Sequence, residues 1–141
     1  MKKTKIAVVL TILLMAVAVG TSARKVPAPK MYIFGFAASF NDTIVHFTDI
    51  QTLDSAWIDT RFDFLEDRSV YSQQLRAFLE AQDMPHRTCM VFYSTNPKKL
   101  AKKLLKMKRL YAQPKEGQRR YDVRRAEGFR FTSVKPILDD E

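Results

Sequence analysis

The sequence has few of the residues from which small functional sites are usually built. Its 141 residues include one cysteine, two histidines, one tryptophan and four glycines. A single cysteine excludes a disulfide within the chain, and two histidines and one cysteine cannot form a zinc site without a carboxylate ligand. The chain also contains no Gly-x-Ser-x-Gly elbow, no phosphate-binding loop and no His-Glu-x-x-His motif. These absences predict a protein that is not an enzyme and that uses no metal or cofactor.

The longest apolar segment is at the N-terminus. Three lysines among the first five residues precede an uncharged run of 15 residues, Ile6 to Gly20, and small residues follow as far as Ala23. This arrangement predicts a secretory signal peptide over residues 1–23, cleaved after Ala23 or Gly20, and hence an exported protein that is periplasmic or secreted. The alternative is an uncleaved membrane anchor, although the run is shorter than the roughly 20 residues that span a bilayer.

The rest of the chain is long enough for one domain with one modest core. Residues 24–30 (Arg-Lys-Val-Pro-Ala-Pro-Lys) contain two prolines, which predict an extended basic linker. We expect a single α+β domain over residues 31–135 and an acidic C-terminal tail over residues 136–141.

Hydrophobic periodicity defines the elements of this domain. Alternating large and small apolar residues after Met31 are typical of a central strand, and Asn96-Pro97 is typical of a helix start. The patterns predict strands over 31–40 and 44–49, a loop with a helical turn around Trp57 over 50–67, a helix over 69–82, a buried strand over 87–94, a helix over 97–111, and strands over 121–123 and 129–134. The order β-β-α-β-α-β-β predicts an α+β two-layer sandwich, in which a mixed sheet carries both helices on one face.

Charge is unevenly distributed along the chain. Residues 24–86 contain six basic and nine acidic residues, whereas residues 87–141 contain 15 basic and six acidic residues. Much of the positive charge lies in the helix predicted over 97–111, on the face opposite its leucines. The residues that we expect to bind an anionic partner are Lys98, Lys99, Lys102, Lys103, Lys106, Arg109, Arg119, Arg120 and Arg124.

This basic face has two interpretations. One is an ordinary solvated helix surface. However, like charges four residues apart, such as Lys98 and Lys102, cost about 0.2–0.5 kcal/mol per pair, and almost no acidic residue nearby in the sequence offsets them. An uncompensated face is more typical of anion binding. The sequence therefore predicts a small, non-enzymatic binding domain of the cell envelope.

Export limits the partners of such a domain. The anions available outside the inner membrane are lipid headgroups, acidic glycans and acidic proteins. Nucleic acid is not expected, because the protein is exported and no aromatic residues interleave with the lysines. The segment from Tyr93 to Asn96 is a second candidate for anion binding, because a strand-to-helix junction could present free backbone amides there, although this geometry is common in α/β folds.

Two alternative functions are left open. The acidic stretch from Asp49 to Asp67 could pair with the basic helix, either within one molecule or across a homo-oligomer, and it matches no calcium loop. A hydrolase would have to use Cys89 or surface carboxylates such as Asp59 and Asp63. The apolar run around Cys89 is typical of a thiol that packs in the core.

The histidines offer little support for catalysis. His86 precedes Cys89 by three positions, so in a strand the two side chains would lie on opposite faces. His46 alternates with apolar neighbours and is expected at the surface, or half-buried with its hydrogen bonds satisfied.

Three segments resemble one group of proteins. They are Met31-Tyr-Ile-Phe-Gly-Phe-Ala-Ala-Ser-Phe-Asn-Asp, His46-Phe-Thr-Asp-Ile-Gln and Met84-Pro-His-Arg-Thr-Cys. They are similar to segments of small uncharacterised exported proteins of gut Bacteroidota, and the similarity extends over most of the chain after the signal peptide. The resemblance implies export, and it implies no activity, ligand or site residue.

Overall fold

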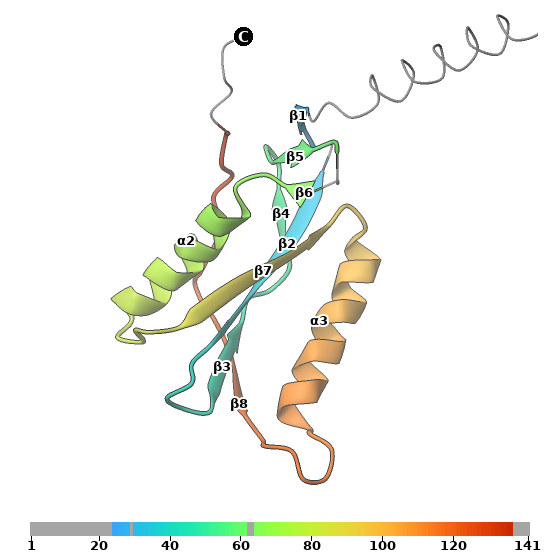
Figure 1. The fold of residues 1–141 in the computed structure, drawn as a ribbon. Coiled ribbons are helices and arrows are strands. Elements are labelled where there is room, and N and C mark those ends of the chain that lie inside the picture. Colours follow the sequence, from blue (N-terminus) through green and yellow to red (C-terminus); the bar gives the residue numbers. More distant parts are fainter. Residues whose placement is uncertain (1–23, 29, 62–63, 137–141) are drawn as a thin grey trace, which may run out of the picture.

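The structure is a computed structural model that describes residues 24–28, 30–61 and 64–136. The predicted signal peptide lies outside the described residues, as does the predicted acidic tail after Pro136. The α+β class is confirmed, with two helices and two sheets in the described part of the chain (Figure 1).

The helices and strands have the following bounds. The helices are α2 (Arg68–Ala81) and α3 (Pro97–Ala112), which confirms both predicted helices. The smaller sheet consists of β1 (Lys25–Pro27), β5 (Trp57–Asp59) and β6 (Phe64–Leu65). The larger sheet consists of β2 (Met31–Ala38), β3 (Ile44–Phe47), β4 (Gln51–Leu53), β7 (Thr88–Ser94) and β8 (Asp122–Arg125).

β2 is the centre of the larger sheet, as the sequence predicts. One of its edges pairs antiparallel with β7, from Tyr32 opposite Ser94 to Ala38 opposite Thr88. Its other edge pairs antiparallel with β4 near its start and with β3 near its end. β8 pairs in parallel with β3, which makes the sheet mixed. The larger sheet therefore ends with β7 on one side and β8 on the other.

The two faces of β2 are covered by different helices. Phe34 packs in a cluster with Leu100 of α3, whereas Gly35 and Ala37 face Leu75 of α2. The prediction that both helices cover one face is therefore wrong, because the sheet lies between α2 and α3 (Figure 1). The physical reason is that both residue sets of this strand are apolar, so both of its faces must be buried.

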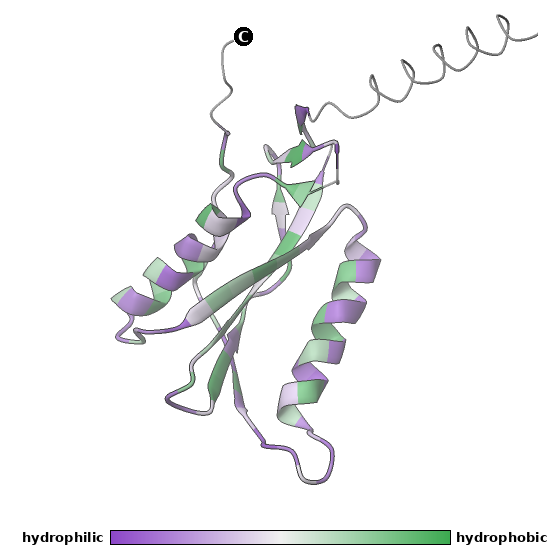
Figure 2. Cartoon of the chain, viewed as in Figure 1, coloured by the Kyte–Doolittle hydropathy of each residue, from purple (hydrophilic) through white to green (hydrophobic). Residues whose placement is uncertain are grey.

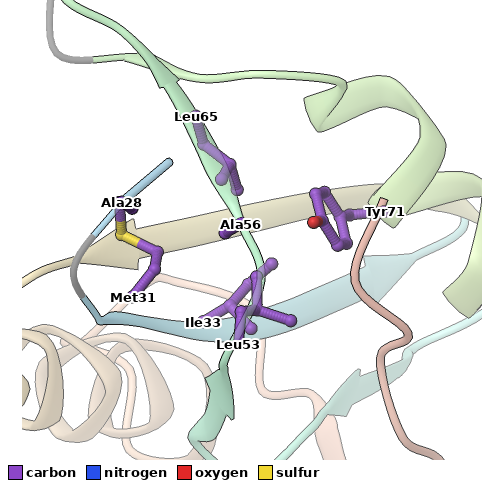
Figure 3. Close-up of a cluster of buried hydrophobic side chains, with 7 residues drawn as sticks. All are labelled: Ala28, Met31, Ile33, Leu53, Ala56, Leu65 and Tyr71. Carbon is purple, nitrogen blue, oxygen red and sulfur yellow. The ribbon is translucent and has the colours of Figure 1, made fainter. Parts of the chain in front are cut away.

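The segment predicted as a linker belongs to the fold. β1 pairs antiparallel with β5, and Ala28 is buried at one end of the core. Figure 3 shows this part of the core, which is formed by Ala28, Met31, Ile33, Leu53, Ala56, Leu65 and Tyr71. The linker prediction is wrong because Pro27 lies on an edge strand, where proline is tolerated.

The segment from residue 50 to residue 67 also differs from its prediction. Instead of a loop with a helical turn, it contains β4, β5 and β6, and Trp57 begins the strand β5. Each of these strands has only two or three residues, too few for an alternating pattern to be readable in the sequence. Leu53 and Leu65 are buried and fix the segment against the core.

The strand predicted over 129–134 does not form. This segment lies along the α2 side of the sheet, and glutamine side chains take the place of a partner strand. Gln51 donates to the carbonyl of Phe129 (3.0 Å). Gln74 donates to the carbonyl of Thr132 (2.9 Å) and accepts from its amide (2.9 Å). Backbone groups of Phe129 and Thr132 are thus hydrogen-bonded without a sheet partner.

β7 forms where predicted but is not a buried strand. It lies at the edge of the sheet, with Thr88 exposed and 50% of Met90 accessible to solvent. Its run of apolar residues is explained by the helices, since α2 and α3 pack on its two faces (Figure 1).

Candidate functional site

α3 is built to present its basic residues outward. The side chain of Asn96 caps it, accepting hydrogen bonds from the amides of Lys98 (3.1 Å) and Lys99 (3.3 Å), and Pro97 occupies its first position. Its apolar stripe packs on the sheet through Leu100, Leu104, Met107 and Tyr111, as predicted. Figure 2 shows hydrophilic and hydrophobic residues alternating along this helix.

The structure places the predicted binding residues in three groups. All nine are exposed. Arg119 and Arg120 lie in the connection between α3 and β8, near the C-terminal end of the helix. Arg124 lies on β8 and forms an ion pair with Asp122 (2.9 Å). The remaining six form the outer surface of α3, which we call the basic face: Lys98, Lys99, Lys102, Lys103, Lys106 and Arg109.

Arg124 lies on a different side of the sheet from the basic face. Its neighbour in β8, Val123, packs in the cluster beneath α3, so alternation places Arg124 on the opposite side of the sheet. Its charge is also offset by Asp122. The structure therefore does not bring Arg124 together with the basic face, because two adjacent residues of a strand face opposite ways; its role in binding stays a prediction.

No acidic residue compensates the basic face within the described part of the chain. α3 itself contains no acidic residue. The ion pairs of the described residues are all made by cations outside α3. In the acidic stretch, Asp49 pairs with Arg125 and Glu66 pairs with Lys25 (3.8 Å). Among the described residues this stretch makes no ion pair with α3.

A feature that the sequence does not reveal is a groove on the outside of α3. Its volume is about 350 Å³, and its apolar lining comes from Leu105 and Leu110, which are 52% and 54% exposed. Lys102, Lys106 and Arg109 surround it. Because two leucines lie among cations, the basic face can offer apolar contact as well as charge.

The strand-to-helix junction does not provide free amides for an anion. The first amides of α3 already donate to Asn96, and the amide of Asn96 itself donates to the hydroxyl of Ser94 (3.0 Å). The cap therefore occupies the donors that an anion would need.

The residues with catalytic chemistry are poorly placed for it. Cys89 is half-buried, and burial raises the pKa of its thiol to about 11, so the thiol is protonated at neutral pH. Asp59 accepts a hydrogen bond from the amide of Arg61 (2.8 Å), and Asp63 lies outside the described residues. Within the described ranges, no group of three or more histidine, cysteine, aspartate or glutamate side chains could hold a metal ion.

His46 and Arg87 form a buried polar cluster that the sequence did not predict. Arg87, 5% exposed, donates through Nη1 to Oδ1 of Asp42 (3.0 Å) and to the carbonyl of Ile44 (2.8 Å), and its Nη2 pairs with Oδ2 of Asp42. The hydrogen bond from Arg87 lowers the pKa of Asp42. This bidentate pair joins the turn before β3 to the start of β7.

His46 is buried beside this pair, at 6% exposure, which corrects the expectation of a surface or satisfied half-buried side chain. Its Nδ1 has no hydrogen-bond partner among the described residues. Burial lowers its pKa, and the positive charges of Arg87 and Arg124 lower it further. His46 is therefore neutral at physiological pH.

Comparisons of the chain with protein-family models, with curated proteins and with solved structures found no match. In the part of the chain that the structure describes, no helix has the length and apolar character of a membrane span. The described fold and surface thus define a small α+β domain with one uncompensated basic helix.

Proposed function

We propose that this protein is a small exported, non-enzymatic binding domain that meets an anionic component of the cell envelope through the basic face of α3. The observation that carries the proposal is that six exposed cations share one helix surface without an ion-pair partner in the described chain. Export rests on the predicted signal peptide and on the resemblance to exported proteins.

The position of the lysines supports a role beyond solubility. Lys98 and Lys99 lie in the first turn of α3, where the helix dipole is positive and a cation is unfavourable by about 0.3–1 kcal/mol. Further like-charge pairs along the helix add to this cost. A surface that only needed to be soluble could mix acidic and basic residues and avoid it.

The exposed leucines support the same proposal. Leu105 and Leu110 line a groove among the cations of the basic face. A partner with anionic groups around an apolar part would bury this surface and pair the charges in one step. Self-association through the acidic stretch is less well supported, because Asp49 and Glu66 already pair within the molecule.

Binding assays with the full chain would test the proposal. The probes are anionic phospholipid vesicles, dextran sulfate and polyglutamate, each at low and high salt. We expect salt-sensitive binding to at least one probe, because screening weakens exposed charge pairs. The variant K98E/K102E/K106E should lose this binding.

The matched control is K30E/R130E/K135E, which makes the same change of net charge at three exposed cations outside α3. It should bind nearly as well as the wild type. If the wild type binds none of the three probes, or if both variants lose binding equally, the basic face is not a binding site.

A further inference from the structure

β7 has an open edge. It pairs only with β2 among the described strands, and it has seven residues, Thr-Cys-Met-Val-Phe-Tyr-Ser, without a proline or a charge. Natural edge strands are usually blunted by shortness, lysine, proline or a bulge, because their free backbone groups pair readily with another strand. β7 carries none of these protections.

The free backbone groups can be assigned from the bonds of Gly35. Its amide donates to the hydroxyl of Thr48 (2.8 Å) and its carbonyl accepts from the amide of Thr48 (2.9 Å), so both groups lie on the side of β3 and β4. Val91, which lies opposite Gly35, is therefore at a position that is not hydrogen-bonded to β2. By alternation, the amides and carbonyls of Cys89, Val91 and Tyr93 face away from the sheet.

The two helices form walls beside this edge. On one face, Nζ of Lys103 lies 4.6 Å from the centre of the Phe92 ring, so this flank of α3 lies over β7. Lys99 and Lys106 neighbour Lys103 on the same flank, four residues before it and three after it. On the other face, a groove of about 370 Å³ lies between α2 and the start of β7 and is lined by residues of α2, among them Arg76, and by residues 86–89.

We infer that an extended acidic segment of a partner polypeptide adds to β7 as a further strand of the sheet. The inference rests on the proposed function, and it names the partner class. The backbone of the segment would pair with Cys89, Val91 and Tyr93, and every second side chain would face the lysines of α3. Acidic residues at those alternate positions would provide the charges that the basic face lacks.

Other occupants fit this edge less well. Lipid headgroups and glycans have no backbone that could continue a β-ladder. A second copy of the chain, paired antiparallel through β7 about a two-fold axis, would bring the two α3 helices together on one face. Lys99, Lys103 and Lys106 would then face the same lysines of the partner.

A peptide of alternating glutamate and threonine, equal in length to β7, tests the inference with the full chain. Its binding would be followed by fluorescence anisotropy at low salt and by amide hydrogen exchange. We expect new protection at the amides of Val91 and Tyr93, and no change at Met90 and Phe92, whose amides already face β2. A peptide of the same sequence, N-methylated at the amides that would face β7, should bind at least about tenfold more weakly, since it lacks the donors of the ladder.

Variants separate strand addition from simple charge attraction. Val91→Pro removes an outward amide without removing a bond to β2, and it should weaken peptide binding, but less than N-methylation of several peptide amides does. K99E/K103E changes the flank over β7 and should also weaken it. K98E/R109E makes the same change of charge on the part of α3 that faces away from β7, and it should have a much smaller effect on the peptide.

Each contrary result has a definite meaning. If the N-methylated and unmodified peptides bind equally, or if the two charge variants weaken binding equally, strand addition is wrong while the proposed anion-binding function stands. If no anionic probe binds, both fail. If the chain alone forms a dimer that Val91→Pro dissociates, a second copy uses the edge and the acidic partner is wrong.

Discussion

Replacing Gly35 by alanine is expected to destabilise the protein, because α2 approaches the sheet closely at this residue. A Cβ atom at position 35 would lie 2.7 Å from Cδ2 of Leu75, 3.1 Å from Cζ of Phe131 and 3.3 Å from Cγ2 of Thr48. Favourable carbon–carbon contacts lie at about 3.5–4.0 Å, so all three neighbours would have to move, and Leu75 the most. Leu75 is completely buried and has little space to move into.

The expected cost is about 1–3 kcal/mol, the usual range for an extra methyl group in a packed core. The sign of the change in the free energy of unfolding is informative. Where a site has room, replacing glycine by alanine stabilises a protein by about 0.4–1 kcal/mol, because it reduces the conformational entropy of the unfolded chain. Urea denaturation monitored by circular dichroism would measure the change in the free energy of unfolding.

A double-mutant cycle with Leu75→Val locates the clash. Valine has no δ carbon, so Gly35→Ala should cost less in the Leu75→Val background, with a coupling of about 0.5–3 kcal/mol. If Gly35→Ala leaves the stability unchanged or raises it, or if the two changes are additive, then α2 does not contact the sheet at Gly35 as described.

Two further predictions concern His46 and the cap of α3. The pKa of His46 is lowered in the folded protein. Around and below the ordinary histidine pKa of 6.5, the unfolded chain therefore binds more protons than the folded protein does. The free energy of unfolding should therefore fall as the pH drops from about 7 to 5, and His46→Gln should remove most of this fall in urea denaturation at several pH values. Asn96→Ala should cost about 0.5–2 kcal/mol and reduce helical circular dichroism, whereas Asn96→Asp, which can still cap, should not.

Both helices and the basic face could be predicted from the sequence. Their signals are local: an apolar residue every three or four positions in α2 and α3, and Asn96-Pro97 at the start of α3. Six of the nine predicted binding residues lie on one helix surface for the same reason. Arg124 lies on the other side of the sheet, and the sequence does not reveal this, because it does not tell which face of a strand a charged side chain is on.

The features that could not be predicted depend on contacts between distant residues. Gln51 and Gln74 bond to the C-terminal segment about 60 to 80 positions away, and nothing in their neighbourhood distinguishes them from surface glutamines. The pair of Arg87 and Asp42 is likewise non-local. The apolar residues of β7 look the same in a buried strand as in an edge strand between two helices, so the sequence does not reveal its open edge.

The parallel pairing of β3 with β8 sets an order of assembly for a nascent chain. β2, β3 and β4 follow one another closely in the sequence and can pair early. β8 pairs with β3 later, because both helices and β7 lie between them in the chain, and closing this long loop costs entropy before the pairing compensates it. Until β8 pairs, β3, which is apolar except for His46, lies at the edge of the sheet opposite β7. Afterwards this edge is formed by a strand that carries Asp122, Arg124 and Arg125. A chain truncated before β8 would thus retain an aggregation-prone edge that the complete chain covers with charge.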